Sequence, residues 1–155
     1  MKIAVTGGAA ESFCRNIYKD TDNRKKLLDR YPKSFFDLYM QEKEEGNVPL
    51  FAVDFECAKD GGVFAALWRL LKRNHLGGNF SQRAIPISQQ AVEICEFFGI
   101  DPYRAESENC YVLLCEEECP GITVIGETEK GPAIRRTDGE SIAYLRRPEP
   151  LPEKS

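Results

Sequence analysis

Residues 60–73, DGGVFAALWRLLKR, carry the clearest secondary-structure signal in the chain and decide which fold we expect. Apolar side chains recur there at helical spacing, which predicts an amphipathic helix over Val63–Arg73. The apolar stripe consists of Val63, Phe64, Leu67, Leu70 and Leu71. Gly61 and Gly62 precede the helix and Gly77 follows it, so glycine marks both of its ends.

The segments on either side of this helix carry further extended and helical patterns. Leu50–Phe55 (LFAVDF) is rich in residues that favour strands, and it predicts one immediately before the glycine pair. Phe80–Ile87 is expected to be extended, because the proline within it disfavours helix at the preceding residue. Ser88 is a suitable N-cap for a second helix, Gln89–Phe98.

The first part of the chain predicts a strand followed by helices. Lys2–Thr6 is a short β-like run that leads into Gly7-Gly8. Residues 13–18 have apolar positions on one helical face, and residues 20–23 are expected to interrupt that helix. A further helical pattern covers residues 35–40.

The last third of the chain is expected to be sheet. Cys110–Leu114 is an unbroken apolar run, typical of a strand buried on both faces, and Ile122–Ile125 is a second strand. Asp138-Gly139, between two further strand patterns, predicts a hairpin. Together these elements predict one α+β domain over residues 1–145, a mixed sheet with packed helices, followed by a flexible tail at 146–155.

Composition excludes several classes of function. The chain has 155 residues with a formal charge of −4, which leaves no broad basic face, so we expect no nucleic-acid partner. Its longest apolar runs are far shorter than a membrane span, so we expect no membrane association. The opening run before Gly7 is too short for the apolar core of a signal peptide, and the expected location is cytoplasmic.

The six cysteines could suggest a disulfide framework or a metal site, but their pattern favours neither. Disulfide-rich domains are smaller and secreted, and the sequence contains no CxxC pair of the kind that structural zinc sites use. We expect reduced, mostly buried thiols and no metal. His75 is the only histidine and is expected in an exposed turn, which weakens any Cys–His or Ser–His catalytic proposal.

Four motifs resemble, in order and spacing, the aminoimidazole ribonucleotide (AIR) synthase-related superfamily. They are Asp60–Trp68 at the glycine pair, Ala84–Ile87, Val92–Tyr103, and Thr123–Gly126 followed by Gly131. The superfamily includes AIR synthase, selenophosphate synthetase, thiamine-monophosphate kinase and the hydrogenase-maturation dehydratase. The resemblance implies a match to the C-terminal α/β domain alone, without the N-terminal domain that binds ATP and Mg²⁺. No bound cofactor is therefore expected for these residues.

Departures from the family motifs argue against inherited catalysis. The family places an Asp and a Thr or Ser ahead of the glycine pair, where this chain has Cys57 and Lys59. Its "Ser-x-Gly" turn is Ser107-Glu108-Asn109 here. The hydrogenase-maturation branch ends in a carbamoyl-accepting cysteine, whereas residues 152–155 are PEKS. We expect no catalytic residue.

A further departure concerns the connection between the two strands of the last third. The family has a helix between the strands that match Cys110–Leu114 and Ile122–Ile125, but only residues 115–121 intervene here. Because a helical crossover needs about a dozen residues or more, we expect one crossover helix to be missing. The prediction is a short acidic loop, with part of one sheet face left uncovered.

Asp60, Gly61 and Gly62 are the candidate anion-binding residues. Free N–H groups and the helix dipole attract phosphate at a helix start, and in the family this loop faces the cleft of a phosphorylated substrate. The alternative is that the glycines only permit a tight turn, and Asp60 would repel a phosphate. Gly7-Gly8 lacks the third glycine of a dinucleotide motif, and Glu116–Glu118 is expected to be a solvated charge run.

Two functions remain open from the sequence. The preferred one is a non-catalytic binding or accessory subunit, a homologue of the C-terminal domain alone, which forms a homodimer or pairs with a separate nucleotide-binding chain. The alternative is one half of a split ATP-dependent synthetase or maturation enzyme, which binds a phosphorylated small molecule through Asp60, Gly61 and Gly62. Substrate and pathway are not encoded in any motif we identify.

Overall fold

The computed structural model describes residues 1–42, 46–138 and 141–147. Five α-helices occur in this part of the chain: α1 (Glu11–Lys19), α2 (Thr21–Arg30), α3 (Ser34–Gln41), α4 (Gly62–Arg73) and α5 (Gln89–Phe98). The strands are β1 (Lys2–Thr6), β2 (Asp54–Cys57), β3 (Gly77–Phe80), β4 (Tyr111–Cys115), β5 (Thr123–Glu129), β6 (Ile134–Asp138) and β7 (Ser141–Tyr144). This confirms the predicted α+β class.

The described strands form one sheet in the order β2-β4-β1-β5-β3-β6-β7. All neighbouring pairs are antiparallel except β3 and β6, so the sheet is mixed, as predicted. The first strand lies in the interior of the sheet, where Lys2 pairs with Cys115 on one side and Glu127 on the other. None of the described helices is long and apolar enough to cross a membrane.

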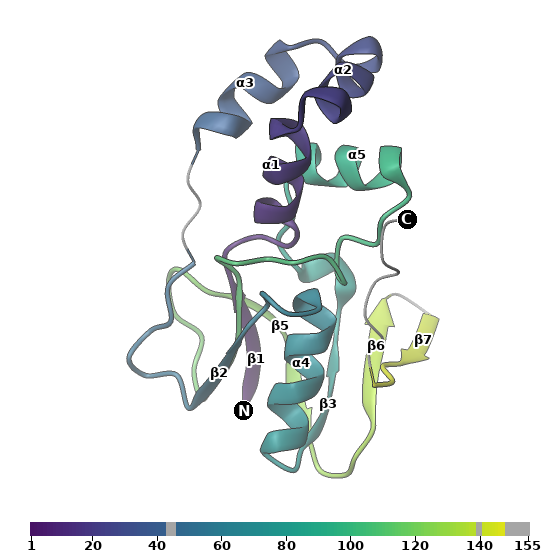
Figure 1. The fold of residues 1–155 in the computed structure, drawn as a ribbon. Coiled ribbons are helices and arrows are strands. Elements are labelled where there is room, and N and C mark those ends of the chain that lie inside the picture. Colours follow the sequence, from purple (N-terminus) through teal and green to yellow (C-terminus); the bar gives the residue numbers. More distant parts are fainter. Residues whose placement is uncertain (43–45, 139–140, 148–155) are drawn as a thin grey trace.

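The described residues form two large apolar cores, one at the sheet and one among the helices beyond its end (Figure 1), and a small third cluster on the other face of the sheet. In the first, α4 packs on one face of the sheet, and its fully buried Leu67, Leu70 and Leu71 meet Val5 and Leu114. The second core joins α1, α2, α3 and α5 beyond the end of the sheet, around buried side chains that include Cys14, Leu27, Phe36 and Ile94.

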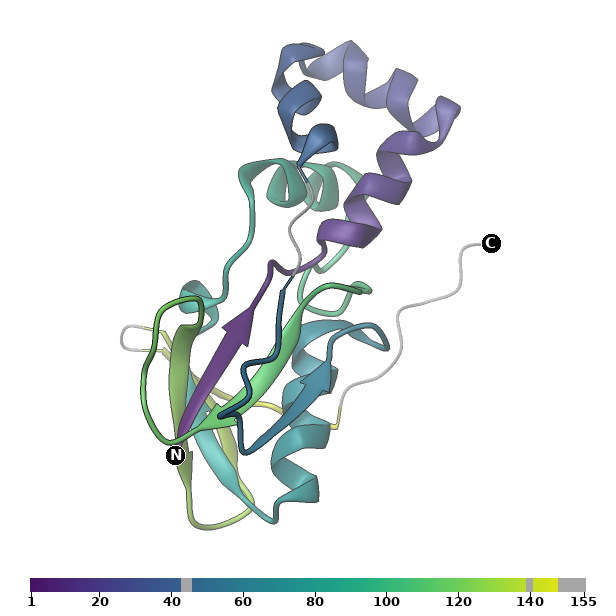
Figure 2. The ribbon, with the colours of Figure 1, turned by 90° about the vertical axis from the view of Figure 1, so that its left-hand side faces the viewer.

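The other face of the sheet carries loops in place of a helix (Figure 2). No helix lies between β4 and β5, which confirms the predicted loss of the crossover helix. Both strands are antiparallel to β1, which lies between them, so the 116–122 loop returns across the sheet. The prediction that part of this face is uncovered is wrong at Ala4 and Leu113, which are fully buried. Ala52 and Ile122, from two separate loops, pack against them.

Several predicted boundaries differ from the structure, and the strand predicted at Ile122–Ile125 is β5, which continues to Glu129. The strand predicted at Leu50–Phe55 begins only at Asp54, because the chain first makes a turn in which Ala52 N–H donates to Pro49 O at 3.1 Å. Phe80–Ile87 is not extended throughout, since a 3₁₀ turn occupies Gln82–Ala84.

A further difference lies between the first two helices. Residues 20–23 do not form a long interruption, because Asp20 accepts a hydrogen bond from Asn23 N–H at 3.0 Å and caps α2 directly. The predicted hairpin strands are present as β6 and β7, although its turn at residues 139–140 lies outside the described residues. Most of the predicted tail, residues 148–155, also lies outside them.

Candidate functional site

The predicted glycine pair lies at the start of α4, between the sheet and the 103–105 segment. Gly61 is the N-cap residue with φ 82°, and Gly62 follows with φ 80°, a conformation that favours glycine. A Cβ atom on Gly62 would lie 2.5 Å from the carbonyl oxygen of Tyr103. Glycine at position 62 is therefore required by both its backbone conformation and close packing.

The start of α4 also has internal hydrogen-bond partners. Phe64 N–H donates to Tyr103 O at 3.1 Å, so the 103–105 segment engages the helix terminus. The backbone oxygen of Asp60 accepts from Arg69 Nη1 at 2.9 Å, while the residue itself is exposed. These contacts account for the local geometry without a ligand, and anion binding by Asp60, Gly61 and Gly62 stays a prediction.

A cluster of ion pairs, which the sequence did not reveal, joins β2 to the last turns of α4. Arg73 contacts Asp54 at 3.0 Å and Glu56 at 2.7 Å, and Arg69 lies 3.6 Å from Glu56. Hydrogen bonds from Arg73, with a further one from Asn74, lower the pKa of Asp54 to about 2. Because acidic and basic groups satisfy one another, this cluster fixes the edge strand on the helix.

The cysteines are not gathered in one cluster, although two of them lie side by side. Cys14, Cys95, Cys110 and Cys115 are buried, as expected for thiols that act as small apolar side chains. The Sγ atoms of Cys14 and Cys95 lie 3.4 Å apart in the second core. Hydrogen bonding to Cys95 and burial raise the pKa of Cys14, so its thiol is protonated and unreactive. His75 is exposed in the turn after α4, as predicted.

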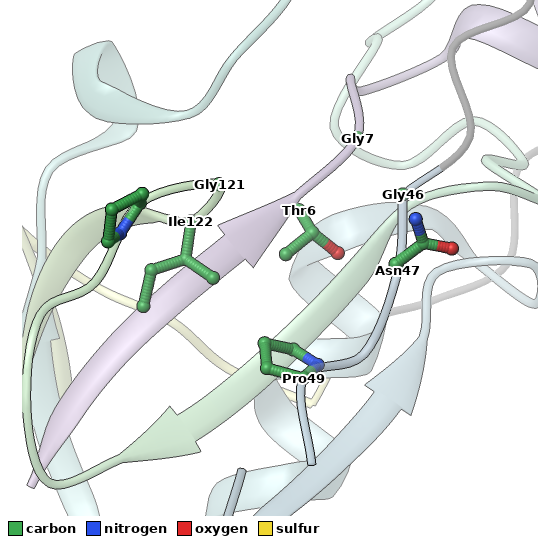
Figure 3. Close-up of a pocket in the computed structure, with 8 residues that line it drawn as sticks. Thr6, Gly7, Gly46, Asn47, Pro49, Gly121 and Ile122 are labelled. Atoms are coloured by element: carbon green, nitrogen blue, oxygen red, sulfur yellow. The ribbon is translucent and has the colours of Figure 1, made fainter. Parts of the chain in front are cut away.

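The loop-covered face contains a pocket of about 380 Å³ at the carboxyl end of β1 (Figure 3). Its walls come from three segments that are distant in sequence: the end of β1, residues 46–49 and residues 120–122. The residues that line it are Thr6, Gly7, Gly46, Asn47, Pro49, Pro120, Gly121 and Ile122. No sequence motif indicated this pocket, since each segment contributes only two or three residues.

Beside this pocket, residues 50–55 expose four large apolar side chains, which we call the 50–55 ridge. They are Leu50 (106% exposed), Phe51 (49%), Val53 (52%) and Phe55 (48%). Phe51 also borders a second hollow, of about 360 Å³, together with Glu116–Cys119. The acidic run is exposed, as predicted, and among the described residues no group of three or more potential ligands is arranged to hold a metal ion.

Comparison with known sequences finds a partial relative. No family model matches the chain. The carbamoyl dehydratase HypE of Azotobacter vinelandii is 29% identical over 68 residues, which make up 42% of this chain and 20% of that protein. The chain therefore matches only a fifth of the length of this curated relative.

Solved structures share the fold over nearly the whole chain. Escherichia coli HypE, a hydrogenase maturation protein, superposes with a TM-score of 0.65 at 20% identity, over 97% of this chain and 50% of that one. HypE in the HypE–HypF complex superposes with a TM-score of 0.63 at 14% identity, over 95% of this chain and 52% of that one. Thiamine monophosphate kinase from Aquifex aeolicus superposes with a TM-score of 0.57 at 18% identity, over 84% of this chain and 48% of that one. The chain thus has the fold of the C-terminal domain of AIR synthase-related proteins, the resemblance that its four motifs predict.

Proposed function

We propose that the chain is a non-catalytic binding or accessory protein that works by associating with another polypeptide. The observation that carries this proposal is the 50–55 ridge, where four large apolar side chains of one six-residue stretch are exposed, since large exposed apolar patches mark sites of association. The ridge leads into β2, which ends the order of strands in the described sheet and pairs only with β4 there. An edge strand beside exposed apolar side chains is a favourable place for a partner to pack.

The comparisons support a partner chain. One of the similar solved structures is a HypE–HypF complex, so a protein with this fold does assemble with a different polypeptide. The chain spans about half of the length of the solved HypE chains. A separate nucleotide-binding chain and a second copy of this chain are the two candidate partners. The four buried free thiols favour a reducing, cytoplasmic location.

Native mass spectrometry and light scattering at micromolar concentration test this proposal, first on the chain alone and then with candidate partner chains. We expect a dimer or a stoichiometric complex, and we expect the double variant Leu50→Ser/Phe51→Ser to abolish it. Leu38→Ser is the matched control, because Leu38 is 65% exposed on α3, away from the ridge. The proposal fails if the wild-type chain stays monomeric with every partner, or if both variants behave alike.

The second candidate function is phosphate handling within a split ATP-dependent synthetase. Its support is the pair of left-handed glycines at the start of a twelve-residue helix. Thermal shift measurements with ATP and inorganic phosphate test it, because a ligand at 100 times its Kd adds about 2.7 kcal/mol of stability. A stabilisation by phosphate that Gly61→Ala reduces supports this function, and no shift with either compound rejects it for this chain.

A further inference from the structure

The hydroxyl of Thr6 is a buried side-chain atom whose hydrogen-bond partner is missing from the described part of the chain. Thr6 ends β1 and is only 4% exposed, and its Oγ1 has no hydrogen-bond partner among the described residues. The two other buried side-chain atoms without a hydrogen bond there, Glu11 Oε2 and Arg15 Nη2, lie 3.4 Å apart and form an ion pair. Because buried polar atoms are nearly always satisfied, the Thr6 hydroxyl points to a partner that the described residues do not supply.

Thr6 is one of the residues that line the 380 Å³ pocket. In Figure 3 its oxygen lies on the side of Gly46 and Asn47, and Ile122 and Pro49 lie around it. A pocket of this size that combines apolar walls with a few convergent polar groups has the general character of a small-molecule site.

The backbone around the pocket keeps it open and preformed. Gly46 N–H donates to Asn109 O at 2.9 Å, which ties the 46–49 segment to the chain before β4. A Cβ atom added to Gly7 would lie 2.2 Å from the Asn109 carbonyl oxygen, and one added to Gly46 would lie 2.3 Å from it. The two glycines therefore allow the segments to meet at one carbonyl group, and no side chain from either of them fills the space between.

The lining defines the chemistry of the ligand. None of the described residues that line the pocket is charged, so nothing there neutralises a phosphate or a carboxylate. The two polar side chains are the Thr6 hydroxyl and the Asn47 carboxamide, and each can both donate and accept a hydrogen bond. Pro49, Pro120 and Ile122 supply apolar surface for a ring. A neutral ring compound that carries an amide suits both kinds of residue. Its amide can donate and accept hydrogen bonds with the two polar side chains, and its ring can pack on the apolar ones.

We propose that this pocket is a binding site for a neutral, amide-bearing ring compound, with Thr6 and Asn47 as its polar contacts. The amide edge pairs with the Thr6 hydroxyl, and the ring lies against the two prolines. None of the lining residues belongs to the neighbouring 50–55 ridge or to the start of α4, so the proposal does not depend on the function proposed above.

Nicotinamide and nicotinate are matched probes, since they differ only in having a carboxamide or a carboxylate. The experiment is a ¹⁵N NMR titration in which the backbone amides of Gly7, Gly46 and Gly121 report on the pocket. A probe of this size reaches a Kd on the order of 1 mM, so the titration extends to about 10 mM. We expect nicotinamide to shift the three glycine signals saturably, and nicotinate to bind at least about tenfold more weakly.

Variants of Thr6 complete the test. Thr6→Val replaces the hydroxyl by a methyl group of similar shape in a strand, so we expect a folded protein whose melting temperature is unchanged or higher. Its affinity for nicotinamide should fall at least about tenfold, and Thr6→Ser should retain binding. The proposal is overturned if no glycine signal shifts, if nicotinate binds equally well, or if folded Thr6→Val binds like the wild type.

Discussion

The two faces of the sheet differ in what covers them. On one face, α4 buries a continuous apolar stripe against the sheet, and ion pairs fix the edge strand to the helix. On the other face, two loops bury only Ala4, Leu113 and Cys115 fully and leave two hollows and four exposed apolar side chains. A helix fills the space above a sheet with its own side chains, whereas loops leave room. Binding capacity in this protein is therefore expected on the loop-covered face.

Truncation of a core leucine should show the largest contrast between the faces. Leu67→Ala removes a fully buried side chain under α4 and should lower the free energy of unfolding by about 3 kcal/mol. Leu50→Ala on the ridge should change it by less than about 0.5 kcal/mol. Urea denaturation at one low protein concentration measures both, and equal losses would contradict the comparison.

Two glycines with similar backbone conformation provide the next contrast. Gly62 under the 103–105 segment has φ 80° and Gly121 on the loop face has φ 90°, so alanine at either should cost about 1–2 kcal/mol. At Gly62 the new Cβ would also meet backbone at 2.5 Å, while at Gly121 nothing lies within 4 Å. We expect Gly62→Ala to be the more destabilised by at least about 1 kcal/mol in urea denaturation. Similar losses would show that close packing at α4 does not matter.

Thiol labelling should reveal which face opens more readily. Cys110 belongs to the core under α4 and Cys115 to the cluster under the loops, and both are fully buried. Burial raises the pKa of both thiols, that of Cys110 to about 12, so each should react only when the structure opens. Pulse alkylation read by mass spectrometry should label Cys115 at least about tenfold faster, equivalent to about 1.4 kcal/mol in opening free energy. Equal rates would mean that the loops are as tightly held as the helix.

Acid should weaken the helix-covered face through Asp54, with the smallest effect of the series. Its pKa is lowered to about 2 by hydrogen bonding to Arg73, below the value of about 3.9 in an unfolded chain. The carboxylate therefore contributes stability that is fully present above about pH 4 and is lost as the pH falls through 2. Asp54→Asn should cost at most about 1 kcal/mol at pH 7, because the pair is partly exposed, and should flatten the decline between pH 4 and pH 2. Identical pH profiles for variant and wild type would exclude this role.

The sequence predicts best those helices and strands whose first and last residues are determined by residues adjacent to them in the sequence. Helix α5 occupies the predicted range, because Ser88 Oγ accepts from Ala91 N–H at 3.1 Å and Gly99 takes a left-handed φ of 67°. Strand β3 was missed because it begins with Gly77 and Gly78, which have low strand propensity. A Cβ on Gly78 would lie 2.7 Å from Glu127 O, so the neighbouring strand determines this element.

The candidate sites also divide into one that depends on adjacent residues and one that depends on residues distant in the sequence. The pair Gly61-Gly62 is visible in the sequence because its residues are adjacent, and the structure places it at a helix start, as predicted. The pocket that Thr6 helps to line could not be predicted from adjacent residues. Its walls are brought together by the order of strands and by the Asn109 carbonyl, neither of which leaves a local pattern. The ridge was predicted as a strand, since its residues favour β structure wherever they lie.

The interior position of β1 has a consequence for how the molecule forms. During synthesis β1 has to wait for partners that the ribosome makes much later, since Ile3 pairs with Leu114 and Gly126. Such distant pairings carry a loop-closure cost and slow the folding reaction. Ile3, Ala4 and Val5 lack these partners until the chain has been made past β5, which makes the nascent β1 segment a natural substrate for a chaperone.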